Sequence, residues 1–242
     1  MSGHSKWANI KRKKARVDAQ RGKIFTRLAR EIIVAARFGS SDPEANPRLK
    51  AAIQRAKEAN IPNENIQRAI QRGIGEADSE DYEEVFYEGY GHGGVAIMLK
   101  ILTANRNRTA SEIRYLFSRH RGSLGEAGCV SWMFKRKGLI IIDKEEFADE
   151  DTLLLIALEA GAEDIRAEKD SFEVITSVED FEKVKNALVL QGIPVVDAQV
   201  TLLPSSTLAL PEKDAGQVLN LIEALEEHDD VQEVYANYEI TE

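Results

Sequence analysis

The segment VSWMFKRKGLIII (residues 130–142) decides the fold, because its apolar end predicts a buried β-strand, bent near Lys137-Gly138. Helical and strand-like patterns then alternate along the chain: a helix over 151–160 ended by Gly161, a hairpin over 164–168 and 172–176, a helix over 178–190 ended by Gly192, and a strand over 195–203. This order, strand-helix-strand-strand-helix-strand, is typical of the split β-α-β or ferredoxin-like arrangement.

The segments on either side of this unit each predict part of a second α+β unit. Before it, strands are expected at 85–88 and 95–102 around a glycine-rich turn, followed by a helix over 109–121 opened by the capping-box spacing of Thr109 and Glu112. After it, residues from 207 onward supply a strand, a helix over 215–227 and a strand over 231–238. Two strands do not make a stable sheet. We therefore expect this tail to return and complete the earlier unit.

The N-terminal part predicts a small helical bundle. Helices are expected over 22–38, 48–59 and 63–72, with Asn46-Pro47 opening the second and Gly73 stopping the third. The acidic segment EADSEDYEE (76–84) marks the boundary to the rest. The sequence thus predicts an α+β multidomain protein with two α/β-sandwich domains after the bundle: a basic helical bundle with an N-terminal arm at 1–76, a discontinuous domain at 77–130 plus 207–242, and an inserted ferredoxin-like domain at 131–206.

Charge is divided unequally along the chain. Residues 1–75 contain 17 Lys and Arg against 6 Asp and Glu, a net charge of +11. The whole chain carries −9, so the remaining residues carry −20. A concentrated cationic module on an anionic body is typical of a protein that binds a polyanion with one end, and nucleic acid is the natural candidate.

Within the basic part, an N-terminal arm and one face of the first helix are the candidate nucleic-acid contacts. The residues are His4, Lys6, Trp7, Lys11, Arg12, Lys13, Lys14 and Arg16 in the arm, and Lys23, Arg27, Arg30 and Arg37 in the helical stripe. Trp7 could be a stacking platform or a hydrophobic anchor on the bundle. The second and third helices also allow a helix-turn-helix interpretation that presents Asn63, Asn65, Gln67 and Arg68, although the turn lacks the usual glycine.

Nothing in the sequence makes a positive case for an enzyme, a cofactor, a metal or a small-molecule substrate. The segment GYGHGG (89–94) fits a dinucleotide-binding spacing but precedes a strand, so a hairpin loop explains it better. The four histidines are scattered, and the single cysteine, Cys129, excludes an internal disulfide. No apolar stretch approaches the ~20 residues that cross a bilayer. We expect a cytoplasmic protein with no membrane partner.

Several stretches resemble the YebC/PmpR family. They are GHSKWANIK (3–11), Lys13-Lys14, DAQRGKIF (18–25), NPRL (46–49), NIP (60–62), YEGYG (87–91), TANRNRT (103–109) and WMF (132–134). Arg12 stands where relatives often carry His. The resemblance implies three domains, the middle one discontinuous, and no catalytic residues. It implies a DNA-binding transcriptional regulator in bacteria and a translational activator in organelles, and assigns the suspected contacts to the arm.

The function expected from charge and resemblance is a non-enzymatic nucleic-acid-binding regulator of gene expression, a DNA-binding transcriptional regulator. The alternative is a ribosome- and rRNA-binding translation factor, for which the arm and the loop 89–94 would reach into an RNA-lined cleft. A protein-interaction module that docks the bundle on an acidic surface is a third possibility. Phosphate-binding cations alone do not distinguish the first two.

Overall fold

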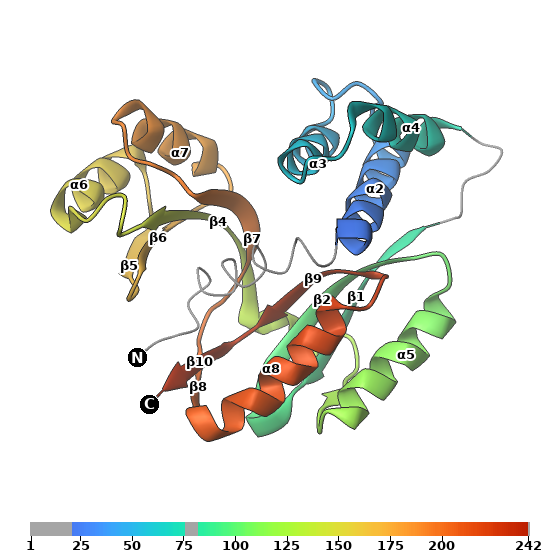
Figure 1. The fold of residues 1–242 in the computed structure, drawn as a ribbon. Helices are drawn as coiled ribbons and strands as arrows, with labels where there is room; N and C mark the ends of the chain where they lie inside the picture. Colours follow the sequence, from blue (N-terminus) through green and yellow to red (C-terminus); the bar gives the residue numbers. More distant parts are fainter. Residues whose placement is uncertain (1–20, 76–81, 242) are drawn as a thin grey trace.

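The computed structural model describes residues 21–75 and 82–241, which form a mixed α/β structure with antiparallel sheets (Figure 1). The first part is a helical bundle of α2 (Arg21–Phe38), α3 (Pro47–Glu58) and α4 (Asn63–Ile74). Its core includes Ile32, Leu49 and Ile66, each at most 1% exposed. As expected, Asn46 caps α3: its side-chain oxygen accepts a hydrogen bond from the Leu49 amide at 3.0 Å.

The sequence predicts that Gly73 stops α4, but the helix continues to Ile74. The glycine instead lets two helices approach closely. A Cβ atom at residue 73 would lie 2.5 Å from the Ile33 carbonyl oxygen and 2.8 Å from the Ala36 Cβ, both in α2. The missing side chain therefore serves the packing of α4 on α2.

The sheet nearest the bundle combines strands from both ends of the remaining chain. Its order is β3-β1-β2-β9. The strand β9 pairs antiparallel with β2, from Ile97↔Ala236 to Ile101↔Val231. Helices α5 (Arg106–Arg119) and α8 (Glu212–Glu226) cover one face of this sheet (Figure 1). The four strands are β1 (Glu83–Tyr90), β2 (Ala96–Thr103), β3 (Ser123–Leu124) and β9 (Val231–Ala236).

Helix α5 begins one turn earlier than the capping-box spacing indicated. Asn105 is the N-cap, and its side-chain oxygen accepts from the Arg108 amide at 3.1 Å. Thr109, expected to open the helix, is fully buried within it. Its hydroxyl is used for a tertiary contact described below.

In the sequence, residues 134–204 lie between β3 and the C-terminal elements, and they form a second four-stranded antiparallel sheet with the order β5-β6-β4-β7. Helices α6 (Glu150–Ala160) and α7 (Phe181–Leu190) pack on it through Leu153, Val184 and Phe172. Residues 131–133 form a short 3-10 turn rather than the start of the expected strand. The strands are β4 (Phe134–Asp143), β5 (Asp164–Ala167), β6 (Ser171–Thr176) and β7 (Asp197–Pro204).

The chain leaves this sheet through β7 and enters a small parallel ribbon of β8 (Leu208–Pro211) and β10 (Tyr238–Thr241). The ribbon lies beside α8 and the C-terminal end of the chain (Figure 1). Among the described residues, no helix is long and apolar enough to span a membrane.

Candidate nucleic-acid interface

The twelve candidate contacts predicted from the sequence fall into two groups in the structure. The eight arm residues, His4, Lys6, Trp7, Lys11, Arg12, Lys13, Lys14 and Arg16, lie outside the described residues, and so does the side chain of Lys23. The structure therefore places only Arg27, Arg30 and Arg37 of the set. All three lie on α2. Arg37 is partly buried near the C-terminal end of that helix.

Arg27 and Arg30 bind the α/β part of the molecule rather than forming an open cationic row. Arg27 donates a hydrogen bond to the carbonyl oxygen of Glu226, at the end of α8. Arg30 Nη1 donates to the carbonyl oxygen of Asp229 at 2.6 Å and to Oδ1 of Asp230 at 2.9 Å. Burial lowers the pKa of Arg27, although the nearby Glu226 and Asp229 oppose that effect. In this conformation the two arginines join the bundle to the turn between α8 and β9.

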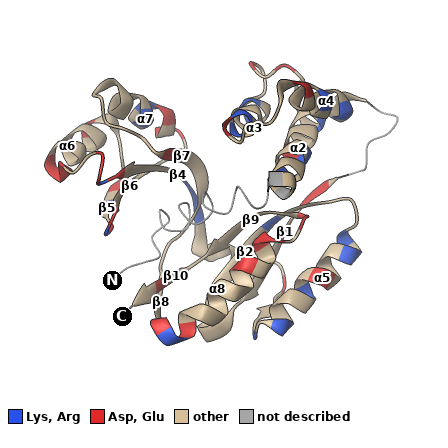
Figure 2. Ribbon diagram, viewed as in Figure 1, with Lys and Arg blue, Asp and Glu red and all other residues tan. Residues whose placement is uncertain are grey.

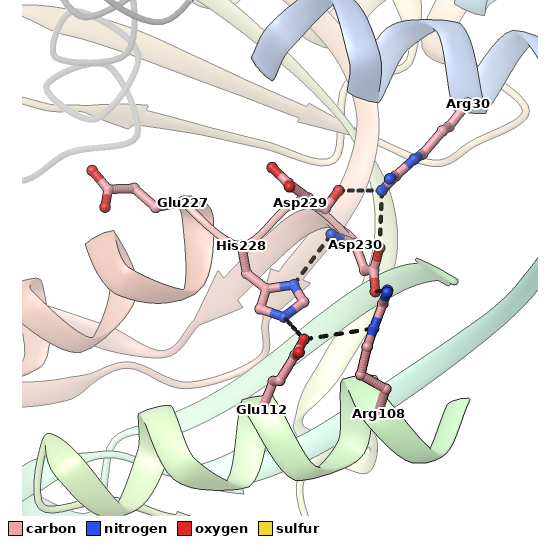
Figure 3. A pocket seen from close by; sticks show the side chains of 7 residues that line it. All are labelled: Arg30, Arg108, Glu112, Glu227, His228, Asp229 and Asp230. Atoms are coloured by element: carbon pink, nitrogen blue, oxygen red, sulfur yellow. Dashed lines mark hydrogen bonds and ion pairs between the residues drawn. The ribbon is translucent and has the colours of Figure 1, made fainter. Parts of the chain in front are cut away.

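Asp230 is the centre of this joint (Figure 3). Its side chain is 3% exposed. While Oδ1 accepts from Arg30, Oδ2 accepts from Arg108 at 2.8 Å and from the Thr109 hydroxyl at 2.7 Å. Burial alone would raise the pKa of Asp230, but the hydrogen bonds from Thr109 and Arg108, with the charge of Arg30, hold the pKa below its ordinary value. One carboxylate thus connects α2, α5 and β9.

A polar cavity of about 390 Å³ lies beside Asp230. His228 Nδ1 accepts from the Asp230 amide at 3.2 Å, so Nε2 carries the proton and donates to Glu112 Oε2 at 2.8 Å. Ligand atoms of Glu112, His228 and Asp230 lie within 4.8 Å of one another, a grouping that could hold a cation. However, those atoms already have hydrogen-bond partners (Figure 3). His228 bonds to Glu112 and to the Asp230 amide, and the Asp230 carboxylate accepts from Arg30 and Arg108. The cavity does not favour phosphate either, because its lining has four carboxylates against two arginines and one histidine. The lining residues are Arg30, Arg108, Glu112, Glu227, His228, Asp229 and Asp230.

Figure 2 shows lysines and arginines on α3 and α4, and five of these are exposed. They are Lys50, Arg55, Lys57, Arg68 and Arg72. Lys50 contacts Glu44 at 2.8 Å, and Arg68 contacts Glu64 within its own helix. Sequence reasoning did not select the α3 cations. Their signal was available, because none of the three falls at a position that the helical period assigns to the core, namely Leu49, Ala52 and Ala56.

The turn between α3 and α4 has the geometry that a helix-turn-helix motif usually obtains from glycine. Asn60 has a φ angle of 58°, in the left-handed region that asparagine tolerates best after glycine. After this turn, the front of α4 exposes Asn63, Asn65 and Gln67. The absence of glycine from this turn therefore does not count against the motif.

The loop 89–94 and Cys129 offer no chemistry of their own. The glycines form a tight turn, His92–Gly94, with φ angles of 71° at Gly93 and 83° at Gly94, and β2 follows it instead of a helix. Gly91 packs against Ile97 and Leu221, whereas Gly93 and Gly94 are exposed. Burial and the neighbouring Glu88 carboxylate raise the pKa of the Cys129 thiol, the opposite of what a nucleophile requires.

The protein is thus a mixed α/β protein in which two arginines, Arg27 and Arg30, tie a basic helical bundle to a body of mainly antiparallel sheets. Residues 5–76 match the family described as the TACO1/YebC protein N-terminal domain, and residues 82–238 match the TACO1/YebC second and third domain. The chain belongs to the TACO1/YebC family.

Similar proteins span nearly the full length of the chain. A protein of Pelotomaculum thermopropionicum named "Probable transcriptional regulatory protein" is 64% identical over 241 residues, covering 99% of each chain. A protein of the same name from Carboxydothermus hydrogenoformans is 62% identical over 244 residues, covering all of both. The crystal structure of a conserved hypothetical protein from Aquifex aeolicus has a TM-score of 0.83 and 51% identity, covering 94% of each chain. The mixed α/β architecture is therefore shared with a solved relative.

Proposed function

We propose that this protein is a non-enzymatic, cytoplasmic regulator of gene expression that binds the phosphate backbone of nucleic acid, with duplex DNA as its target. The observation that carries the proposal is the division of charge, +11 over residues 1–75 against −20 over the rest. The acidic body would repel a second copy of the polyanion and so orient docking through the basic end. The name shared by the relatives, "Probable transcriptional regulatory protein", supports a regulatory role.

The proposal divides the chain as the sequence suggested: a DNA-contacting bundle at 1–76, a discontinuous domain at 77–130 plus 207–242, and an inserted ferredoxin-like domain at 131–206. The pairing of β9 with β2 and the strand order β5-β6-β4-β7 support this division.

The contact surface that we propose consists of the arm residues and the exposed cations of α3 and α4. Arg27 and Arg30 contribute to it indirectly, because their contacts with Glu226, Asp229 and Asp230 hold the bundle in place. Lys50, Arg55 and Lys57 are exposed residues of one short helix. Arg55 and Lys57 have no ion pair with a described carboxylate. These side chains would neutralise phosphates and release counterions on binding.

The test compares three variants of the full chain: Lys11→Gln/Lys13→Gln/Lys14→Gln in the arm, Lys50→Gln/Arg55→Gln/Lys57→Gln on α3, and the control Lys169→Gln/Lys183→Gln/Lys213→Gln. The three control lysines are exposed residues of the acidic part. Binding to duplex DNA is measured between about 50 mM and 200 mM salt, where each lost phosphate contact lowers the log–log slope by about 0.9. We expect the arm and α3 variants to lose slope and affinity, and the control to match the wild type.

The same experiment includes single-stranded RNA and purified ribosomes. Preferential binding to duplex DNA supports transcriptional regulation. Preferential, salt-sensitive co-sedimentation with ribosomes that the arm variant loses would replace it with the translation-factor function. Wild-type protein that binds none of the three in a salt-dependent way would overturn the proposal.

A further inference from the structure

The outer face of α5 is a second cationic surface, located within the part of the chain that is otherwise strongly acidic. Residues 76–242 contain 15 of the 32 Lys and Arg, and five of these 15 fall between 106 and 121 with a single carboxylate, Glu112. The five arginines, all exposed, are Arg106, Arg108, Arg114, Arg119 and Arg121. Figure 2 shows basic residues near both ends of this helix, on the outside of the sheet.

The packing of α5 explains its apolar residues and Arg108, which binds Asp230, but not the other four arginines. Ile113 and Phe117 are fully buried against the sheet and α8. Among the described residues, no carboxylate lies within ion-pair distance, 4.0 Å, of the Arg106, Arg114 or Arg119 guanidinium. The side chains therefore extend from the helix without an intramolecular acidic partner in the described part of the chain. An arginine-rich face with so little compensation favours an anionic ligand.

The segment TANRNRT (103–109), at the start of α5, has structural roles for most of its polar residues. Thr103 and Thr109 hydroxyls are 2.8 Å apart, Asn105 caps the helix, and Arg108 binds Asp230. Asn107 remains exposed, with no such role for its side chain. Arg106 is also exposed, and its guanidinium lies close enough to the Tyr87 hydroxyl to favour the charged form of that group.

The end of the helix also has an exposed arginine. Arg121 has a φ angle of 59°, in the left-handed region where glycine is the usual residue after a helix. An arginine in that region costs roughly 1 kcal/mol relative to glycine. Its guanidinium makes only a long contact, 3.4 Å, with Gln217. The fold retains a long cation where a residue without a side chain would fit better.

Tyr115 lies between the arginines and is 60% exposed. A flat aromatic ring next to guanidinium groups is the usual combination on surfaces that bind a nucleic-acid strand, since the ring stacks on a base while the arginines hold phosphates. An acidic protein surface would not require the ring, and the single tyrosine is too little apolar surface for a membrane.

We infer that the outer face of α5 is a second phosphate-backbone contact, which binds the same nucleic acid as the basic bundle. The inference rests on the proposed function. Asp230 supports it structurally, because this residue binds both Arg30 of α2 and Arg108 of α5 and so holds the N-terminal end of α5 next to the bundle. The N-terminal end of α5 therefore lies beside the bundle, although the carboxylates of Glu112, Glu227, Asp229 and Asp230 line the cavity at the joint itself.

The test uses Arg114→Gln/Arg119→Gln in the full chain, with Lys169→Gln/Lys183→Gln as the matched control. All four residues are exposed, so both variants should fold, which circular dichroism checks. We expect the α5 variant to lose up to about 1.8 units of log–log salt slope on duplex DNA, or about 1.4 on single-stranded RNA, for two contacts. The charge-conserving Arg114→Lys/Arg119→Lys variant should keep most of the slope.

Tyr115→Ala and Tyr115→Phe separate nucleic acid from other anions. On single-stranded RNA, we expect Tyr115→Ala to weaken binding by about fivefold or more, and Tyr115→Phe to bind like the wild type. If the wild type binds but the α5 variant has the control's affinity and slope, the α5 inference is wrong and the proposed function stands. If the wild type itself does not bind, the proposed function fails first.

Discussion

Arg30 and Asp230 are separated by 200 positions in the sequence, but Nη1 of the first lies 2.9 Å from Oδ1 of the second. The contact joins the helical bundle to the sheet that begins at β1. Arg108 shares the same carboxylate, so three separate elements depend on one buried acid. Several measurable consequences follow from this joint and from the packing around it.

Asp230→Asn should lower the free energy of unfolding by about 3 kcal/mol or more, because it leaves two arginines beside a buried neutral side chain. Chemical denaturation measures the change. Asp164→Asn is the matched control, since Asp164 forms an exposed pair with Arg166 at 3.3 Å, and its loss should cost less than about 1 kcal/mol. Equal effects of the two substitutions would show that the joint does not stabilise the fold.

Acid should weaken the fold through Asp230 and Glu31. Burial alone would raise the pKa of Glu31, but the hydrogen bond from Arg48 and the charge of Lys100 outweigh it, so its pKa is lowered, like that of Asp230. A lowered folded-state pKa means that the stabilisation is complete above the ordinary carboxylate pKa and is lost as pH falls through the folded-state value. We expect the free energy of unfolding to decrease below about pH 5. Asp230→Asn should have a flatter pH profile; a profile parallel to the wild type would contradict this assignment.

Gly73→Ala should destabilise the bundle, although alanine is the better helix former by about 1 kcal/mol. The new Cβ would meet the Ile33 carbonyl at 2.5 Å, so α2 and α4 must separate, at a cost of roughly 1–3 kcal/mol. Gly216→Ala is the control, because Gly216 lies in α8 with no atom within 4 Å of its Cβ position, and it should stabilise by about 0.5–1 kcal/mol. Thermal unfolding of both variants gives the two signs.

Glu88→Gln should loosen the loop that carries Trp132. The Glu88 carboxylate accepts from the amides of Gly128, Val130 and Ser131 at 2.8–2.9 Å, and these bonds keep its pKa low despite burial. A glutamine offers one acceptor oxygen and turns a donor toward the amides, at an expected cost of about 2–3 kcal/mol.

The readout is Trp132 fluorescence during denaturant unfolding, in a Trp7→Phe background that leaves one tryptophan. Glu126→Gln, at an exposed position in the same loop, should leave the midpoint unchanged. An unchanged midpoint for Glu88→Gln as well would mean that the three amide bonds contribute nothing measurable.

Local sequence patterns predicted most of the helices and strands, because their causes lie within a few residues. Helix α2 follows from the spacing of Leu28, Ile32 and Ala35, and the end of α6 follows from Gly161, whose φ is 107°. The start of α5 was misplaced because Thr109 and Glu112 fit a capping box, whereas Asn105 makes the cap. Asp230 binds the Thr109 hydroxyl instead, and the spacing of residues 105–112 contains no sign of that distant partner.

The candidate site was less predictable for a similar reason. Arg27 and Arg30 have the sequence pattern of a solvated cationic stripe, and only the folded chain reveals that residues 226–230 meet them. Conversely, Arg114 and Arg119 were averaged into an acidic body of charge −20, although both are exposed residues of α5. Net charge per segment describes neither case, because the direction of a side chain is set by tertiary packing.

The pairing of β2 with β9 has a consequence for the time course of synthesis. Strand β2 leaves the ribosome early, but its neighbour β9 appears only after residues 104–230 have been made. Until then, one edge of β2 and the joint for Arg30 and Arg108 lack their partners, so the bundle emerges first and acquires its anchor last. A nascent chain arrested before Asp230 would hold a folded basic end that is not yet fixed to the body.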